Sequence, residues 1–220
     1  MAERDAVIDA PRPAQGTETE QESEARPQDE CRRTRILDAA ERCFVASGFH
    51  GARMSQIAKE AKMSPGHIYH YFESKERIIA EMVRTHSEDK KCMLDQFEEA
   101  GDRVVDQLIE NLESNVDSST DPFWSALMLE ITAEATRNPE IAATLRESDS
   151  EIKTRVLNCL KGGTDKQELE MRLEILVALF QGLGIRNIVN PNLDKALITK
   201  LMKDIVEVLF RSSDNKTESQ

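Results

Sequence analysis

The chain has 220 residues, of which 39% are hydrophobic and 32% are charged, and its formal net charge is −12. These values exclude a disordered protein and fit a soluble, helix-rich one with a sizeable core. No apolar run approaches the roughly 18 residues of a membrane helix, and no signal-peptide stretch is recognisable, so we expect a cytoplasmic protein without a membrane partner.

Residues 1–30 are rich in Pro, Gln, Glu and Ala and are predicted to form a disordered tail. The apolar period beyond them is helical, which predicts an all-α fold of about nine helices. A small N-terminal domain covers 31–80, a larger helical domain covers 81–211, and a second disordered tail covers 212–220. We expect helices at about 32–47, 54–62, 65–71, 75–97, 102–116, 121–137, 139–160, 164–189 and 193–211.

The third helix has an unusual composition, since both tyrosines of the chain and two of its four histidines lie within five positions of it. Ser64 is a natural N-cap and Pro65 suits the first helical position. On a helical wheel, Ile68, Tyr71 and Phe72 share one side, as core residues do. The opposite side carries Gly66, His67, Tyr69 and His70.

Two short helices at 54–62 and 65–71, joined by a tight turn, are typical of a helix-turn-helix unit of about 53–72. The second helix of such a unit enters the DNA major groove, where Tyr69 and His70 can donate to phosphates or bases. Residues 32–84 carry a net charge of +4, whereas 1–31 carry −6 and 85–220 carry −10. A basic segment on an acidic protein is typical of a small DNA-binding domain.

Residues 33–80 resemble the DNA-binding domain of TetR-family transcriptional regulators. The resemblance is carried by I-L-D-A-A (36–40), I-A-K-E-A (57–61) and S-P-G-H-I-Y-H-Y-F-E-S-K-E (64–76), and more weakly by E-A-T-R-N-P (134–139) and L-F-Q-G-L (179–183). It implies DNA contacts by the start of the second helix, by the third helix and by a following lysine. The predicted DNA-binding residues are Arg53, Met54, Ser55, Pro65, Gly66, His67, Tyr69, His70 and Lys75.

The helix at 164–189 is apolar on more than one side, so several of its faces must be buried. Gly182 and Gly184 would let another helix approach closely. The resemblance implies that this helix and the last one form a two-fold homodimer interface; a core within one subunit is the alternative. The predicted interface residues are Leu176, Leu179, Gly182, Leu183, Leu201, Ile205 and Leu209.

Large apolar side chains between these regions predict a pocket for a small-molecule effector, as in family members, although such side chains also fill ordinary cores. The predicted lining is Phe97, Phe123, Trp124, Leu127, Met128, Ile131 and Phe180. Glu130 and Glu134 would favour a cationic ligand there; the alternative is that both are solvated. The series His86, Asp89 and Cys92 is spread around its helix, so we expect no metal, and no cofactor motif is present.

The sequence therefore predicts a ligand-responsive DNA-binding regulator, most simply a dimeric repressor of a palindromic operator that a small-molecule effector releases. The alternative is an all-helical small-molecule binding protein or enzyme that keeps a vestigial DNA-binding motif. No catalytic motif supports an enzyme.

Overall fold

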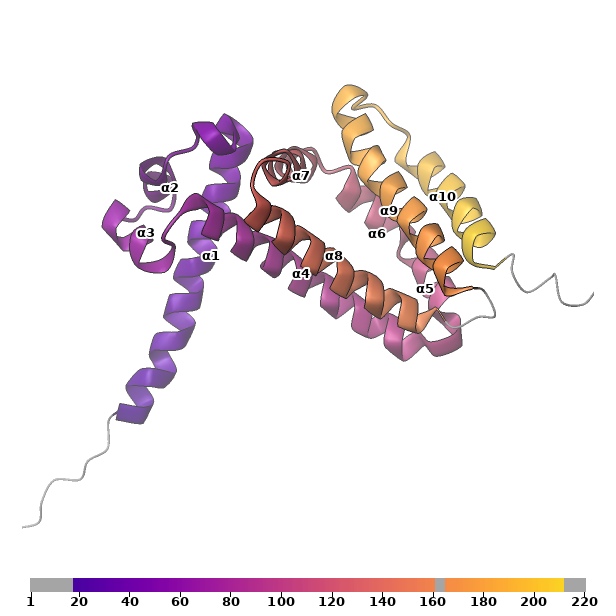
Figure 1. Cartoon of the computed structure of the whole chain (residues 1–220), viewed down its shortest axis with the longest axis horizontal. Coiled ribbons are helices and arrows are strands. Elements are labelled where there is room, and N and C mark those ends of the chain that lie inside the picture. The colour runs from indigo at the N-terminus through magenta and orange to yellow at the C-terminus, as the bar shows by residue number, and fades with distance from the viewer. Residues whose placement is uncertain (1–17, 161–164, 212–220) are drawn as a thin grey trace, which may run out of the picture.

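The structure is a computed structural model that describes residues 18–160 and 165–211, and the side chains within them except those of 18–27 and 89–93. Helices are the only regular structure in this part of the chain, which confirms the all-α prediction (Figure 1). They are α1 (Glu18–Gly51), α2 (Met54–Glu60), α3 (Pro65–Tyr71), α4 (Lys75–Ala100), the 3-10 turn η1 (Gly101–Arg103), α5 (Val104–Glu110), α6 (Leu112–Ser119), α7 (Pro122–Ala135), α8 (Pro139–Cys159), α9 (Lys166–Val189) and α10 (Lys195–Phe210). Within the described residues, no helix has the length and apolar composition of a membrane span.

Side-chain caps set where several helices begin. The Ser64 hydroxyl accepts a hydrogen bond from the backbone N–H of His67 at the start of α3. Ser74 caps α4 in the same way, and Asp121 accepts from the N–H of Trp124 at the start of α7. Because each cap satisfies an N–H that the helix cannot pair, these sequence signals locate the starts well.

Two predicted boundaries were wrong. Helix α1 begins at Glu18, within the segment predicted to be disordered, because residues 18–30 are rich in good helix formers and Asp29 bonds to both Arg32 and Tyr71. The predicted helix at 102–116 is η1, α5 and α6, with a junction at Asn111. The predicted tails at 1–17 and 212–220 lie outside the described residues.

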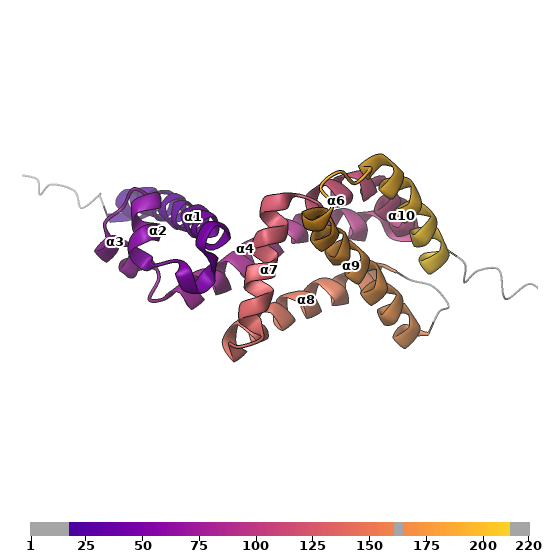
Figure 2. The same ribbon diagram turned by 90° about the horizontal axis from the view of Figure 1, so that it is seen from above.

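The buried side chains form two clusters. The first lies among α1, α2, α3, the start of α4, one face of α7 and the start of α8. The second joins α4 to α5, α6, α8, α9 and α10. Helix α7 lies between the helices of the first cluster and α9 with α10 (Figure 2). It is therefore placed to connect the two ends of the molecule.

Gly184 allows α9 to approach α6 and α7 closely. A Cβ at this position would lie 2.8 Å from the carbonyl oxygen of Ser119 and 3.0 Å from the hydroxyl oxygen of Ser125. We expect Gly184→Ala to lower the free energy of unfolding by about 1–3 kcal/mol, because the helices must separate. Urea denaturation measures this. Asn158→Ala, at an exposed position of α8 away from this contact, is the control and reports a gain in helix propensity alone. Equal stability of the two variants would contradict the prediction.

Candidate nucleic-acid interface and ligand cavity

Helix α3 has one buried and one exposed side, as the helical wheel predicts. Ile68 and Phe72 are buried in the first cluster. Tyr69 is 53% exposed, although it is a large aromatic side chain. Pro65, Gly66, His67 and His70 are also exposed. The helix therefore presents a glycine, two imidazoles and a phenol to solvent from a rigid support.

Tyr71 is half-buried and fastens α3 to α1. Its hydroxyl donates to a carboxylate oxygen of Asp29 at 2.8 Å. Its ring stacks against His67, with 5.7 Å between ring centroids, and meets the edge of His70 at 5.3 Å. Tyr71 thus orients both histidines of the exposed side.

The start of α2 lies beside this surface and displays two more polar side chains. The backbone N–H of Arg53, the N-cap residue, donates to the side-chain oxygen of Gln56 at 2.7 Å. Arg53 and Ser55 are exposed, whereas Met54 packs partly against the first cluster. In the described part of the chain, no carboxylate pairs with the guanidinium of Arg53.

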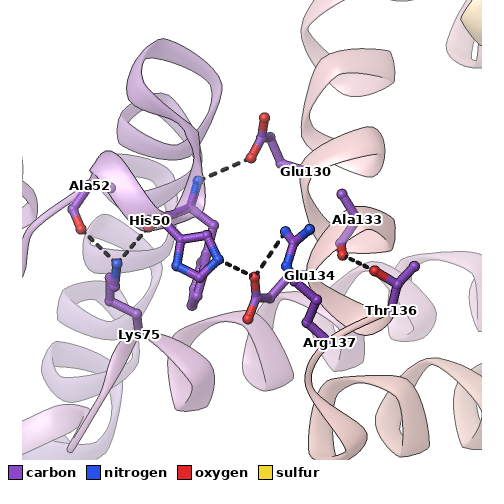
Figure 3. A network of polar contacts seen from close by, with 9 residues as sticks. His50, Ala52, Lys75, Glu130, Ala133, Glu134, Thr136 and Arg137 are labelled. Atoms are coloured by element: carbon purple, nitrogen blue, oxygen red, sulfur yellow. Dashed lines mark hydrogen bonds and ion pairs between the residues drawn. The ribbon is translucent and has the colours of Figure 1, made fainter.

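Lys75 does not project as a free cation. Its ammonium donates to the carbonyl oxygens of Phe49, at 2.5 Å, and Ala52, at 2.8 Å (Figure 3). It also lies 4.4 Å from the centroid of the Phe49 ring, within cation–π range. Two of its three N–H groups are therefore used to hold the turn at 48–52, which begins where Gly48 (φ 71°) breaks the helical backbone of α1 and ends just before α2. The sequence did not indicate this role.

Two carboxylates of α7 hold the same turn from the other side (Figure 3). Glu130 accepts a hydrogen bond from the backbone N–H of Phe49 at 3.0 Å. Glu134, only 5% exposed, lies 2.9 Å from the ring nitrogen of His50 and 3.4 Å from the guanidinium of Arg137. We call Glu130 and Glu134 the α7 carboxylates. Since both are committed to these contacts, the idea that they favour a cationic ligand was wrong.

A cavity of about 420 Å³ lies among α4, α5, α6, α7, α8 and α9. Four of the predicted residues line it: Phe97, Trp124, Met128 and Phe180. The other three do not, because Phe123 is exposed and Leu127 and Ile131 are buried in the first cluster. Helix α7 is apolar on two sides, and sequence alone did not show which side faces the cavity. The sequence also missed its polar lining residues, among them Asn115, Ser119, Ser125, Thr132, Asp149, Lys153 and Gln181.

Trp124 connects the cavity to α1 by a second route. Its ring meets the edge of the His86 ring, with 4.3 Å between centroids. The Nε2 atom of His86 lies 3.0 Å from a carboxylate oxygen of Glu41 on α1. The other members of the series considered for a metal, Asp89 and Cys92, have side chains outside the description.

Helices α9 and α10 carry an apolar surface that no other part of residues 18–160 and 165–211 covers. On α9 the exposed apolar side chains follow one side of the helix. On α10 they continue at one-turn intervals, except that Asp204 stands between Leu201 and Val208. The residues of this surface, which we call the α9–α10 stripe, are Met171, Ile175, Ala178, Gly182, Ile185, Val189, Leu197, Leu201 and Val208. Gly182 and Leu201 were predicted interface residues and lie on it. Leu176 is buried in the second cluster, and Leu179, Leu183, Ile205 and Leu209 pack partly against that cluster.

Comparisons with known proteins agree with these features. Residues 36–82 match the family described as bacterial regulatory proteins, tetR family, and residues 100–211 match the C-terminal domain of BetI-type transcriptional repressors. The chain belongs to the tetR family. It is therefore a DNA-binding transcriptional regulator, and the alternative of a vestigial DNA-binding motif is not favoured.

Three relatives illustrate the similarity. The transcriptional regulator UidR of Escherichia coli K12 is 35% identical over 139 residues, which are 62% of this chain and 68% of UidR. The repressor AcnR of Corynebacterium efficiens is 27% identical over 145 residues, 66% of this chain and 72% of AcnR. The structure of Salmonella enterica GusR superposes with a TM-score of 0.63 at 29% identity, covering 82% of this chain and 95% of GusR.

Proposed function

We propose that this tetR-family protein acts in the cytoplasm as a homodimeric repressor that binds a palindromic operator and is released by a small molecule in the cavity. The observation that carries the proposal is that one helix, α7, contacts both the cavity and the turn that leads into the DNA-binding helices. The exposed side of α3 suits the DNA major groove, and α7 lies between the cavity and the turn that precedes α2. Two α3 helices about one DNA turn (~34 Å) apart would read the two half-sites.

The proposed DNA-binding domain covers 31–80 and the regulatory domain 81–211. Within the first, we assign DNA contacts to Arg53, Ser55, Gly66, Tyr69 and His70, which are exposed. Pro65 and His67 lie beside them, and partly buried Met54 supports the start of α2. Lys75 acts as a positioning residue, because two backbone carbonyls already hold its ammonium.

The first test is selection of bound sequences from random double-stranded DNA by the purified protein. A palindrome with half-sites one turn apart is expected. Affinity for it should fall steeply as salt rises, because basic side chains displace counterions from phosphates. An absence of any enriched sequence would contradict a specific operator.

Single changes on the exposed side of α3 should weaken operator binding without loss of stability. Tyr69→Phe and His70→Ala each remove a hydrogen-bonding group from an exposed position outside the buried core. A loss of about fivefold to a hundredfold is expected for one base or phosphate contact. Fluorescence anisotropy with the selected operator measures affinity, and circular dichroism checks folding. Thr85→Ala, an exposed change on α4 outside the motif, is the control for the loss of a hydrogen-bonding group. Wild-type affinity of both α3 variants would remove these residues from the interface.

Helix α7 is the proposed route from the cavity to DNA. One side of it supplies Trp124, Met128 and Thr132 to the cavity, and the other side supplies the α7 carboxylates that hold the turn at 48–52. A ligand that displaces α7 therefore moves the end of α1, and with it the start of α2. For release, the ligand must bind the displaced state more tightly than the DNA-binding state.

Neutralising the α7 carboxylates should reduce this coupling. We expect the double variant Glu130→Gln, Glu134→Gln to bind ligand in the cavity but to show at least about fivefold less change in operator affinity when a releasing compound is added, since coupling free energies are about 1–3 kcal/mol. Operator anisotropy with and without a compound from a release screen measures the change. Glu147→Gln, exposed on α8, is the matched control. Undiminished release by the double variant would exclude this route.

A further inference from the structure

The cavity is almost free of unpaired charge. Of the residues that line it, only Asp149 and Lys153 are ionisable, and they pair with each other at 2.7 Å. The ammonium of Lys153 also pairs with Glu174 of α9. Hydrogen bonds to Asp149 and then to Glu174 raise the pKa of Lys153, so it stays protonated at neutral pH. The positive charge of Lys153 is therefore offset by the carboxylates of Asp149 and Glu174, which are both half exposed.

The polar groups left for a ligand are neutral. Asn115 and Ser119 lie one turn apart on α6, Thr132 lies on α7 and Gln181 on α9. Among the described residues, their side chains make no hydrogen bond with the protein. The rest of the wall consists of apolar side chains, with Trp124, Phe97 and Phe180 the largest. Such walls suit an apolar body that carries hydrogen-bonding groups at more than one point.

We propose that the effector is an uncharged amphipathic molecule, with an apolar body and two or more hydroxyl or carbonyl oxygens, held by Asn115, Ser119, Thr132 and Gln181. This inference rests on the proposed function of the cavity. An anionic group would have to compete with Asp149 and Glu174 for Lys153, and would enter an apolar space at a desolvation cost that no free cation offsets. A cationic group finds no unpaired carboxylate among the lining residues.

Trp124 is the only tryptophan of the chain, so its fluorescence reports occupancy of the cavity directly. Three probes share one apolar chain and differ in head group: octyl β-D-glucoside, octyl sulfate and octyltrimethylammonium. Each is titrated below its micellar concentration into the full-length protein without DNA. We expect saturable binding of octyl glucoside, at least about tenfold tighter than binding of either charged probe. Tighter binding of a charged probe, or no saturable change with octyl glucoside, overturns the proposal.

Two variants of α6 test whether Asn115 contacts the bound molecule. Asn115→Leu should weaken octyl glucoside binding about fivefold or more, the usual effect of one lost neutral hydrogen bond, while Ser114→Leu, exposed on the same helix, should leave it unchanged. Equal binding by both variants removes Asn115 from the site and refutes the assignment. Operator release is measured separately. Binding of the neutral probe without release supports the ligand class and contradicts the release mechanism. Release by charged compounds alone supports the release mechanism and contradicts the ligand class.

Discussion

Replacing Leu201 with glutamate is expected to make the protein monomeric and to reduce operator affinity by about 10²–10⁴-fold. Leu201 is 52% exposed at the centre of the α10 part of the α9–α10 stripe. A charge there would have to be buried in a dimer without a partner, which is strongly unfavourable. A monomer keeps one α3 and loses the avidity of two linked half-sites, which accounts for the size of the effect.

Analytical ultracentrifugation measures the oligomeric state and anisotropy measures operator affinity. Ala196→Glu is the matched control, because it adds the same charge at an exposed position of α10 that lies off the stripe. Ile175→Glu on α9 should reproduce the effect of Leu201→Glu, since both residues belong to one surface. If the Leu201→Glu protein stays dimeric, the α9–α10 stripe is not the dimer interface.

The α9–α10 stripe also shows where sequence reasoning was limited. The fold class and the position of α3 follow from strong local signals, namely caps, prolines and a helical period with one clearly polar side. Helix α9 is apolar nearly all round, so its period does not show which side packs within the subunit. The predicted interface contained Leu176, which the second cluster buries, and omitted Ile175, its exposed neighbour.

The cavity was only partly predictable for the same reason. Trp124 and Met128 line it, whereas Leu127 and Ile131, one turn apart on α7, face the first cluster. The neutral polar residues Asn115 and Gln181 carry no distinctive sequence pattern. Contacts between residues distant in sequence, such as that of Glu130 with Phe49, depend on the packing of whole helices. Such contacts were not visible in any local motif.

Replacing Lys75 with methionine should destabilise the protein by about 2–4 kcal/mol and weaken operator binding as a consequence. The change leaves the carbonyls of Phe49 and Ala52 without their donor, at about 1–3 kcal/mol for a buried polar group left unpaired, and removes the cation from the Phe49 ring. The turn then no longer fixes the start of α2 at Arg53. Urea denaturation measures the stability.

Salt dependence separates this positioning role from a direct phosphate contact. A lysine that binds phosphate would lower the slope of log affinity against log salt by about 1 when removed, and would leave stability nearly unchanged. A positioning lysine would lower stability and affinity while the slope of the remaining specific binding stays the same. Lys59→Met, an exposed change on α2, removes the same charge without touching the turn. Because two carbonyls already hold the ammonium of Lys75, we expect lower stability and affinity with an unchanged salt slope. A reduced slope with full stability would show instead that Lys75 contacts DNA directly.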